Sequence, residues 1–243
     1  KTVVLATVVL GAVDKSKDYF PLSVEFTDKL YAGGFIKGGK WVKREGAPSD
    51  TAILFGRIID RAIRPLFPAG FKQEVQVMAT ILSNDKDNDV IIPAFTAVSA
   101  ALMLSDIPFN GPVSAVRVGL KEGKISLFPT VSELKTSPLD LLVCRDLEGI
   151  NMIEAGAQIV DNDIVLSAIE EAFKTGEQLN RRLTEFSQKH AKAKIKFEDL
   201  SPPKELVTEI SKLINPNLEE FMKDGTDGAH IAAEEKIKEI VIS

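Results

Sequence analysis

The residues with the clearest chemical potential lie in residues 38–71, where basic side chains are concentrated. This stretch holds six basic and three acidic side chains, whereas the 243-residue chain has a net charge of −5. A local excess of positive charge on an acidic protein predicts contact with an anionic partner. The basic residues are Lys40, Lys43, Arg44, Arg57, Arg61 and Arg64.

The first half of this stretch has the features of a nucleic-acid-binding loop. Glycines lie on both sides of residues 40–44, and Trp41 is the only tryptophan of the chain. Bases of a single strand stack on such a ring while neighbouring cations meet phosphates. The alternative is that Trp41 folds back onto the core and leaves solvated charges around it. The predicted binding residues are Lys40, Trp41, Val42, Lys43 and Arg44.

The second half predicts a helix with three arginines on one side. Ser49 is a suitable N-cap, and two prolines mark the end of the helix. Arg57, Arg61 and Arg64 are spaced i, i+4, i+7, opposite a broad apolar face. The arginine fork suits bidentate contact with phosphate, so these residues are predicted to contact phosphate or RNA. The alternative is a solvated face steadied by Asp60.

Several motifs around this helix resemble one enzyme family. The segments PLSVEF, KLYAGGFIKGG, REGAPS, RIIDRAIRPLFPAGF, EVQVMATILS and IPFNGPVSAVRVG occur in this order. They are similar to the first ribonuclease-PH-type core of polynucleotide phosphorylase, and the likeness covers most of residues 1–170. The chain departs from the family at Trp41 and Val42, where two Phe are usual. It also departs at Ala47, where Arg is common, and at Ala62, where Pro is common.

The resemblance implies a fold and a domain division. The fold class is α+β: a ribonuclease-PH-like core (ribosomal protein S5 domain 2-like) followed by a small all-α domain. The core is expected over residues 1–194, with its N-terminal strands missing, and part of the all-α RNA-binding or linker domain over residues 195–243. The chain is therefore expected to be a fragment of a longer protein.

The resemblance also implies an activity. Family members are phosphorolytic 3′→5′ exoribonucleases of mRNA degradation, in which inorganic phosphate releases nucleoside diphosphates from RNA. A cytoplasmic homotrimeric ring, with possible degradosome-type partners, is implied for the full-length protein. The family places its phosphate-binding residues and the ligands of Mg²⁺ or Mn²⁺ in a second core. No catalytic residue and no metal ligand is therefore assigned here, and the segment alone is expected to be inactive. Its expected role is to bind and guide single-stranded RNA.

Two other classes of function remain open at this point. One is a non-catalytic RNA-binding subunit of an exosome-like ring. The other is a small-molecule kinase with a related α+β fold, which the missing glycine-rich phosphate loop argues against.

Composition excludes several kinds of site. The chain is 44% hydrophobic and 27% charged, without the roughly 20-residue apolar run of a membrane-spanning helix. The single cysteine, Cys144, excludes an internal disulfide and lies in an apolar run that predicts burial. Two histidines, His190 and His230, are far apart in the sequence and offer no metal or triad spacing. Residues 83–89 begin like a calcium loop but lack its Gly and Glu positions, which predicts a solvated turn.

The periodicity of apolar residues, together with the residues typical of helix ends and turns, predicts the elements that position these residues. A long helix over 161–192 is expected to break near Gly176, and 195–200 to form an extended linker. Helices are then predicted from Ser201 to Leu213, from Asn215 onward, and over 229–242. The predicted strands are residues 2–10, 21–26, 74–82, 112–120, 124–128, 139–144 and 149–154, with a buried helix over 92–104.

Overall fold

The structure, a computed structural model, describes residues 1–13, 17–35, 47–222 and 237–238, with the backbone alone for residue 213 and residues 216–222. The chain forms two compact units, residues 1–198 and residues 199–243. The described residues of the first unit form both sheets and four α-helices, and the unit has the α+β class predicted from the sequence.

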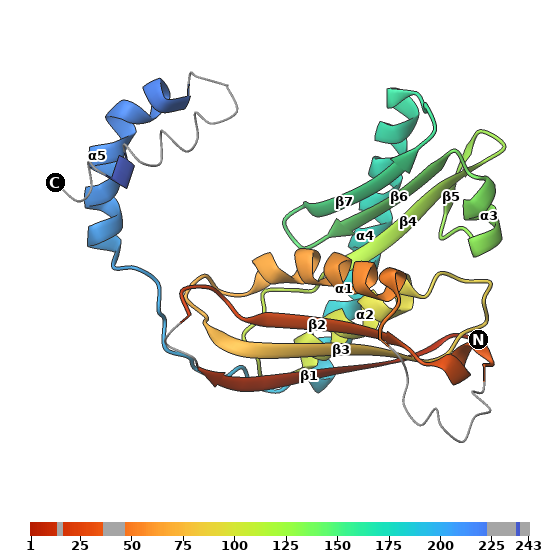
Figure 1. Ribbon diagram of the computed structural model, residues 1–243, viewed down its shortest axis with the longest axis horizontal. Coiled ribbons are helices and arrows are strands. Elements are labelled where there is room, and N and C mark those ends of the chain that lie inside the picture. The colour runs from red at the N-terminus through yellow and green to blue at the C-terminus, as the bar shows by residue number, and fades with distance from the viewer. Residues whose placement is uncertain (14–16, 36–46, 223–236, 239–243) are drawn as a thin grey trace. The chain divides into compact units, whose positions relative to one another are not determined.

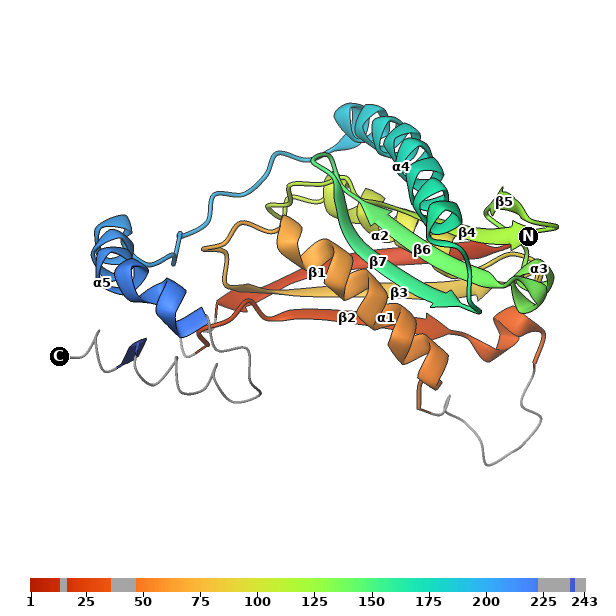
Figure 2. The same cartoon turned by 90° about the horizontal axis from the view of Figure 1, so that it is seen from above.

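A three-stranded sheet forms one outer layer of the first unit (Figure 1). Its strands are β1 (Val3–Val13), β2 (Leu22–Asp28) and β3 (Gln73–Ser83). The central strand β3 pairs antiparallel with β1 and parallel with β2. The parallel pair is joined by a crossover that contains helix α1 (Asp50–Ile63), which crosses over the sheet (Figure 2).

A second, four-stranded sheet lies beyond α1 and the buried helix α2 (Ile91–Leu104). Its strand order is β5-β4-β6-β7, with antiparallel pairing throughout. One face contributes Ala115, Leu142 and Cys144 to the core that also holds α1 and α2. The opposite face contributes Val116, Leu141 and Val143 to a separate core under α4. The strands are β4 (Ser114–Lys121), β5 (Lys124–Leu127), β6 (Leu139–Arg145) and β7 (Ile150–Ala157).

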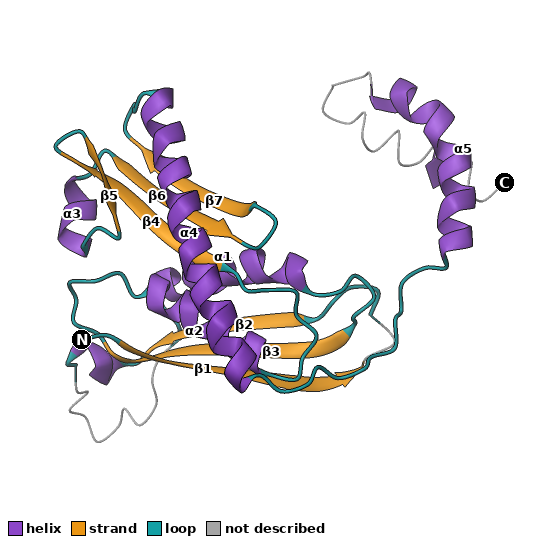
Figure 3. Cartoon of the chain, turned by 180° about the vertical axis from the view of Figure 1, so that it is seen from behind, coloured by secondary structure: helices purple, strands orange, loops and turns teal. Residues whose placement is uncertain are grey.

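Helix α4 (Asn162–His190) covers the outer face of the second sheet (Figure 3). The prediction of a break at Gly176 is wrong, because the helix runs through this residue. Ser114 Oγ donates a hydrogen bond to the Gly176 carbonyl at 3.0 Å, and a Cβ at Gly176 would lie 3.2 Å from that hydroxyl oxygen. The glycine therefore permits close approach between helix and sheet rather than ending the helix. The short helix α3 (Val131–Thr136) lies beside β4.

The first unit extends past the domain boundary expected at residue 194. The Ile195 amide donates to the Asp106 carbonyl at 2.8 Å, and the Phe197 ring meets the Phe71 ring edge-on at 5.2 Å. Lys194 Nζ donates to the carbonyls of Leu102 and Ser105, at the end of α2. Residues 195–198 of the predicted linker thus belong to the first unit.

The second unit contains helix α5 (Lys204–Met222). The prediction of separate helices starting at Ser201 and at Asn215 is wrong in both positions. The Val207 amide donates to the Pro203 carbonyl, which makes Pro203 the first acceptor of the helix. The helix then continues through Pro216, although proline supplies no N–H for the helical hydrogen bond there. The predicted helix over 229–242 lies outside the described residues apart from 237–238.

Hydrogen exchange is expected to be faster in α5 than in β3. Side chains in the first turns of α5 are exposed, including those of Leu206 and Val207, whereas Val77 and Ala79 are buried in the core. Amides protected mainly by local structure exchange through low-energy openings, while core strands require nearly global unfolding. Mass spectrometry of the exchanging chain should separate the two segments by orders of magnitude in rate. Equal protection would contradict this expectation.

Composition led to two predictions, one about the burial of Cys144 and one about membrane-spanning helices. Cys144 is buried, and this burial, followed by the charge of Glu154, raises the pKa of its thiol. Across the part of the chain that the structure describes, no helix combines the length and apolarity needed to span a membrane.

Candidate nucleic-acid interface

Helix α1 forms where the sequence predicts it. The Ser49 hydroxyl accepts a hydrogen bond from the Ala52 amide at 3.2 Å and caps the first turn. Gly56 faces β2 so closely that a Cβ there would lie 3.1 Å from the Val24 carbonyl oxygen. The Phe55 ring meets Phe26 edge-on at 5.3 Å. These contacts fix which side of α1 faces the core and which side faces outward.

Arg64, the last of the three arginines, is engaged in contacts within the fold. Its Nε and Nη2 donate to the Asp60 carboxylate at 3.1 and 2.7 Å. Nη1 donates to the Phe20 carbonyl at 3.0 Å, and Nη2 donates to the Leu22 carbonyl at 3.3 Å. Arg64 therefore joins the end of α1 to the start of β2, and Asp60 serves as its partner.

Arg57 and Arg61 have a different environment. Both side chains are exposed on the outer side of α1, and neither forms an ion pair with any other described residue. Their guanidinium groups are free to make bidentate contacts with phosphate oxygens. Of the three predicted contacts, these two are available without breaking a bond of the fold.

The predicted binding loop cannot be placed beside them. Residues 40–44, from Lys40 to Arg44, lie outside the described residues. The roles of Trp41, Val42, Lys43 and their neighbours stay predictions from sequence.

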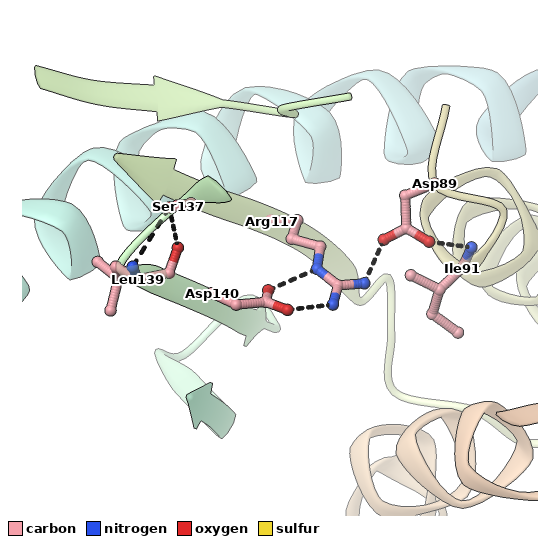
Figure 4. Close-up of polar contacts among 6 residues, drawn as sticks. All are labelled: Asp89, Ile91, Arg117, Ser137, Leu139 and Asp140. Carbon is pink, nitrogen blue, oxygen red and sulfur yellow. Dashed lines mark hydrogen bonds and ion pairs between the residues drawn. The ribbon is translucent and has the colours of Figure 1, made fainter. Parts of the chain in front are cut away.

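A cluster of charges that the sequence reasoning missed lies between the second sheet and the start of α2 (Figure 4). Arg117 of β4 donates two hydrogen bonds to Asp140 of β6, at 2.7 and 2.6 Å, and a third to Asp89 at 2.6 Å. Asp89 also accepts from the Ile91 amide at the start of α2. Burial by itself would lower the pKa of Arg117, but the hydrogen bonds and charges of Asp140 and Asp89 outweigh it and raise that pKa. The available signal was one charged residue flanked by apolar residues inside each strand, Arg117 in β4 and Asp140 in β6.

The loop before α2 uses its carboxylates internally. Asp85 accepts hydrogen bonds from the backbone and side chain of Asn88 and from the Asp87 amide. These hydrogen bonds, chiefly those from Asn88, lower the pKa of Asp85 to about 2. A cavity of about 520 Å³ lies beside this loop and Arg117, with Lys86 and Lys135 in its lining. Within the described ranges, no group of three or more His, Cys, Asp and Glu residues is placed to hold a metal ion.

Comparison with protein families decides the identity of this fold. A model described as 3′ exoribonuclease family, domain 1, matches residues 1–108, and a model of domain 2 of the same family matches residues 111–175. The chain belongs to the 3′ exoribonuclease family. The resemblance inferred from the motifs and the ribonuclease-PH-like fold are thereby confirmed.

Curated relatives of the chain carry the name polyribonucleotide nucleotidyltransferase. The relative from Geobacillus kaustophilus is 39% identical over 242 residues, which is 100% of this chain and 33% of the relative. The relative from Thermus thermophilus is 45% identical over 208 residues, or 86% of this chain and 29% of the relative. The chain thus spans about a third or less of the length of these relatives.

A solved structure shares the fold of this family member. The crystal structure of rice (Oryza sativa) Rrp46 matches with a TM-score of 0.62, covering 77% of this chain and 84% of that chain. At 16% sequence identity, this likeness concerns the fold alone.

Proposed function

We propose that this chain is the RNA-holding part of a phosphorolytic 3′→5′ exoribonuclease, an enzyme that releases nucleoside diphosphates from RNA with inorganic phosphate. The names of the curated relatives support the class of enzyme. The exposed pair Arg57 and Arg61, without ion pairs to described residues, is the observation that carries the RNA-holding role. The proposal includes the loop residues Lys40, Trp41, Val42, Lys43 and Arg44 as further contacts with single-stranded RNA.

The remaining features of the proposal concern the whole protein. We propose a cytoplasmic homotrimeric ring that acts in mRNA degradation, with degradosome-type partners. Mg²⁺ or Mn²⁺ would offset charge that develops on the reacting phosphate. The described residues contain no fitting ligand cluster, so no step is assigned to a metal on this part of the chain.

Removal of Arg57 and Arg61 is expected to lower the salt dependence of RNA binding. Each arginine that neutralises one phosphate of a single strand contributes roughly 0.7 to the slope of log affinity against log salt. The double variant Arg57→Ala/Arg61→Ala should therefore lose about 1.4 from this slope. The measurement is fluorescence anisotropy of a labelled oligoribonucleotide at several salt concentrations. An unchanged slope would show that α1 does not touch the RNA backbone.

A matched control separates this effect from a general loss of charge. Arg182 is an exposed arginine on α4, away from α1, and Arg182→Ala should leave the slope nearly unchanged.

The same assay tests the loop: Lys43→Ala/Arg44→Ala should also lower the slope by about 1.4. Trp41→Ala should instead weaken binding by about 1–3 kcal/mol through lost stacking, with little change in slope.

A further inference from the structure

Arg145, the last residue of β6, is a buried cation with poorly formed polar contacts. The residue is only 9% exposed, and its guanidinium lies 3.9 Å from the centre of the Phe173 ring. Nη1 reaches the Phe173 carbonyl at 3.4 Å and the Glu177 carboxylate at 3.5 Å, while Nε is buried without a partner among the described residues. Arg117 in the same sheet, by contrast, makes three bonds of 2.6–2.7 Å to carboxylates. A buried guanidinium ordinarily has such a partner.

The nearest acidic groups do not supply this partner. Glu177 is 66% exposed, so solvent weakens its attraction for Arg145. The Asp146 carboxylate accepts hydrogen bonds from the amides of Glu148 and Gly149, and so closes its own turn. Arg145 therefore has an incompletely balanced charge at the end of strand β6.

A cavity of about 740 Å³ lies beside Arg145, between the β6–β7 turn and helix α4. Asn180, which is 2% exposed, donates from Nδ2 to the carbonyls of Arg145 and Asp146. These two bonds fix the turn against the helix, so the floor of the cavity is held in place. A volume of this size accommodates a ligand as large as a nucleotide.

The rim of the cavity adds two cations to the buried one. Lys174 and Arg181 line it, and Arg181 forms no ion pair with the rest of the described chain. Three carboxylates also line it: Asp146, which is engaged in its own turn, and Glu177 and Glu185, which are exposed enough to turn toward solvent. An anion that enters would meet Arg145 below and Arg181 at the mouth.

We propose that this cavity binds the phosphate group of a small ligand, with Arg145 as the buried contact and Arg181 as the contact at the rim. The planar fork of arginine matches the oxygens of a phosphate. The ligand is either free orthophosphate or a nucleotide that carries the same group. This inference uses no residue of α1 and does not depend on the RNA-binding proposal.

Nuclear magnetic resonance titration of the 243-residue chain with orthophosphate, with ADP and with adenosine tests this site. The Arg145 Nε–H resonance is expected to shift with both phosphate-bearing probes and not with adenosine. Equal affinities for the two would identify free phosphate, and tighter binding of ADP would identify a nucleotide. Absence of any shift at Arg145, or equal binding of adenosine, would overturn the proposal.

Three substitutions sharpen the test. Arg181→Ala should weaken phosphate binding about threefold to tenfold, as expected for one partly exposed charge, while its exposed neighbour Arg182→Ala should not. Glu177→Gln should strengthen phosphate binding about threefold, because it removes the carboxylate that competes with phosphate for Arg145. If Glu177 only supported the fold, the same substitution would not strengthen phosphate binding. Because both sites are exposed, the fold should survive these changes. Equal effects at Arg181 and Arg182, or weaker binding in Glu177→Gln, would refute the site.

Discussion

Replacement of Phe71 by alanine is expected to lower the free energy of unfolding by about 3–5 kcal/mol. Phe71 is 1% exposed and joins a cluster of rings: Phe20 at 5.7 Å, Phe67 at 6.2 Å and Phe197 at 5.2 Å between ring centres. Truncation removes buried apolar surface and leaves a cavity that the surrounding rings only partly fill. Because domains are stable by only about 5–15 kcal/mol, the loss is a large share of the total.

Phe35→Ala is the matched control for this prediction. Phe35 is 66% exposed and contacts the Lys86 ammonium, 5.2 Å from its ring centre. The same chemical change there should shift the urea midpoint only slightly, because little surface is returned to water. Similar losses for both variants would show that the aromatic cluster does not stabilise the first unit in the way the packing indicates.

Replacement of Arg117 by leucine is expected to cost about 3 kcal/mol of unfolding free energy. The Asp89 side chain is only 10% exposed and would lose its cation, which leaves a buried charge with no opposite charge beside it and only the Ile91 amide as a hydrogen-bond donor. Asp140 is 40% exposed and can be rehydrated, so the expected loss is at the lower end for a buried pair. Urea unfolding followed by circular dichroism measures the change.

Two further variants test the cause of that loss. Arg117→Leu/Asp89→Asn should be more stable than Arg117→Leu alone, because the uncompensated charge is gone. Lys121→Met removes another cation of β4, one whose pair with Glu133 is exposed, and should leave the midpoint nearly unchanged. If Arg117→Leu unfolds at the wild-type midpoint, the cluster does not hold the second sheet to the loop before α2.

Local signals in the sequence determined most of the secondary structure of the first unit. Helix α1 begins beside Ser49 because that hydroxyl satisfies an amide at the helix start, and β3 follows from a run of β-branched and apolar residues. The family motifs extended this to the fold. Such signals act over a few residues, so they can be recognised in the sequence without knowledge of the tertiary contacts.

The same local signals failed where a residue serves a distant contact. Gly176 reads as a helix breaker in sequence, but the approach of Ser114, 62 residues away, makes a glycine suitable there.

The three arginines of α1 show the same limit at the candidate interface. Their spacing places Arg57, Arg61 and Arg64 on one side of the helix, and the position of Asp60 four residues before Arg64 indicates only that one local ion pair. Only the tertiary structure brings the carbonyls of Phe20 and Leu22 to Arg64 and leaves the other two exposed.

The ion pairs of the second sheet were likewise decided by its register. Arg117 and Asp140 are 23 residues apart, and antiparallel pairing of β4 with β6 brings them together. Arg145 meets the Phe173 ring only because α4 crosses the end of β6. The sequence by itself thus determined most elements of the first unit, the family and the charged stretch. The tertiary structure decided which charges are neutralised within the fold, because charge pairing depends on distances between segments that are remote along the chain.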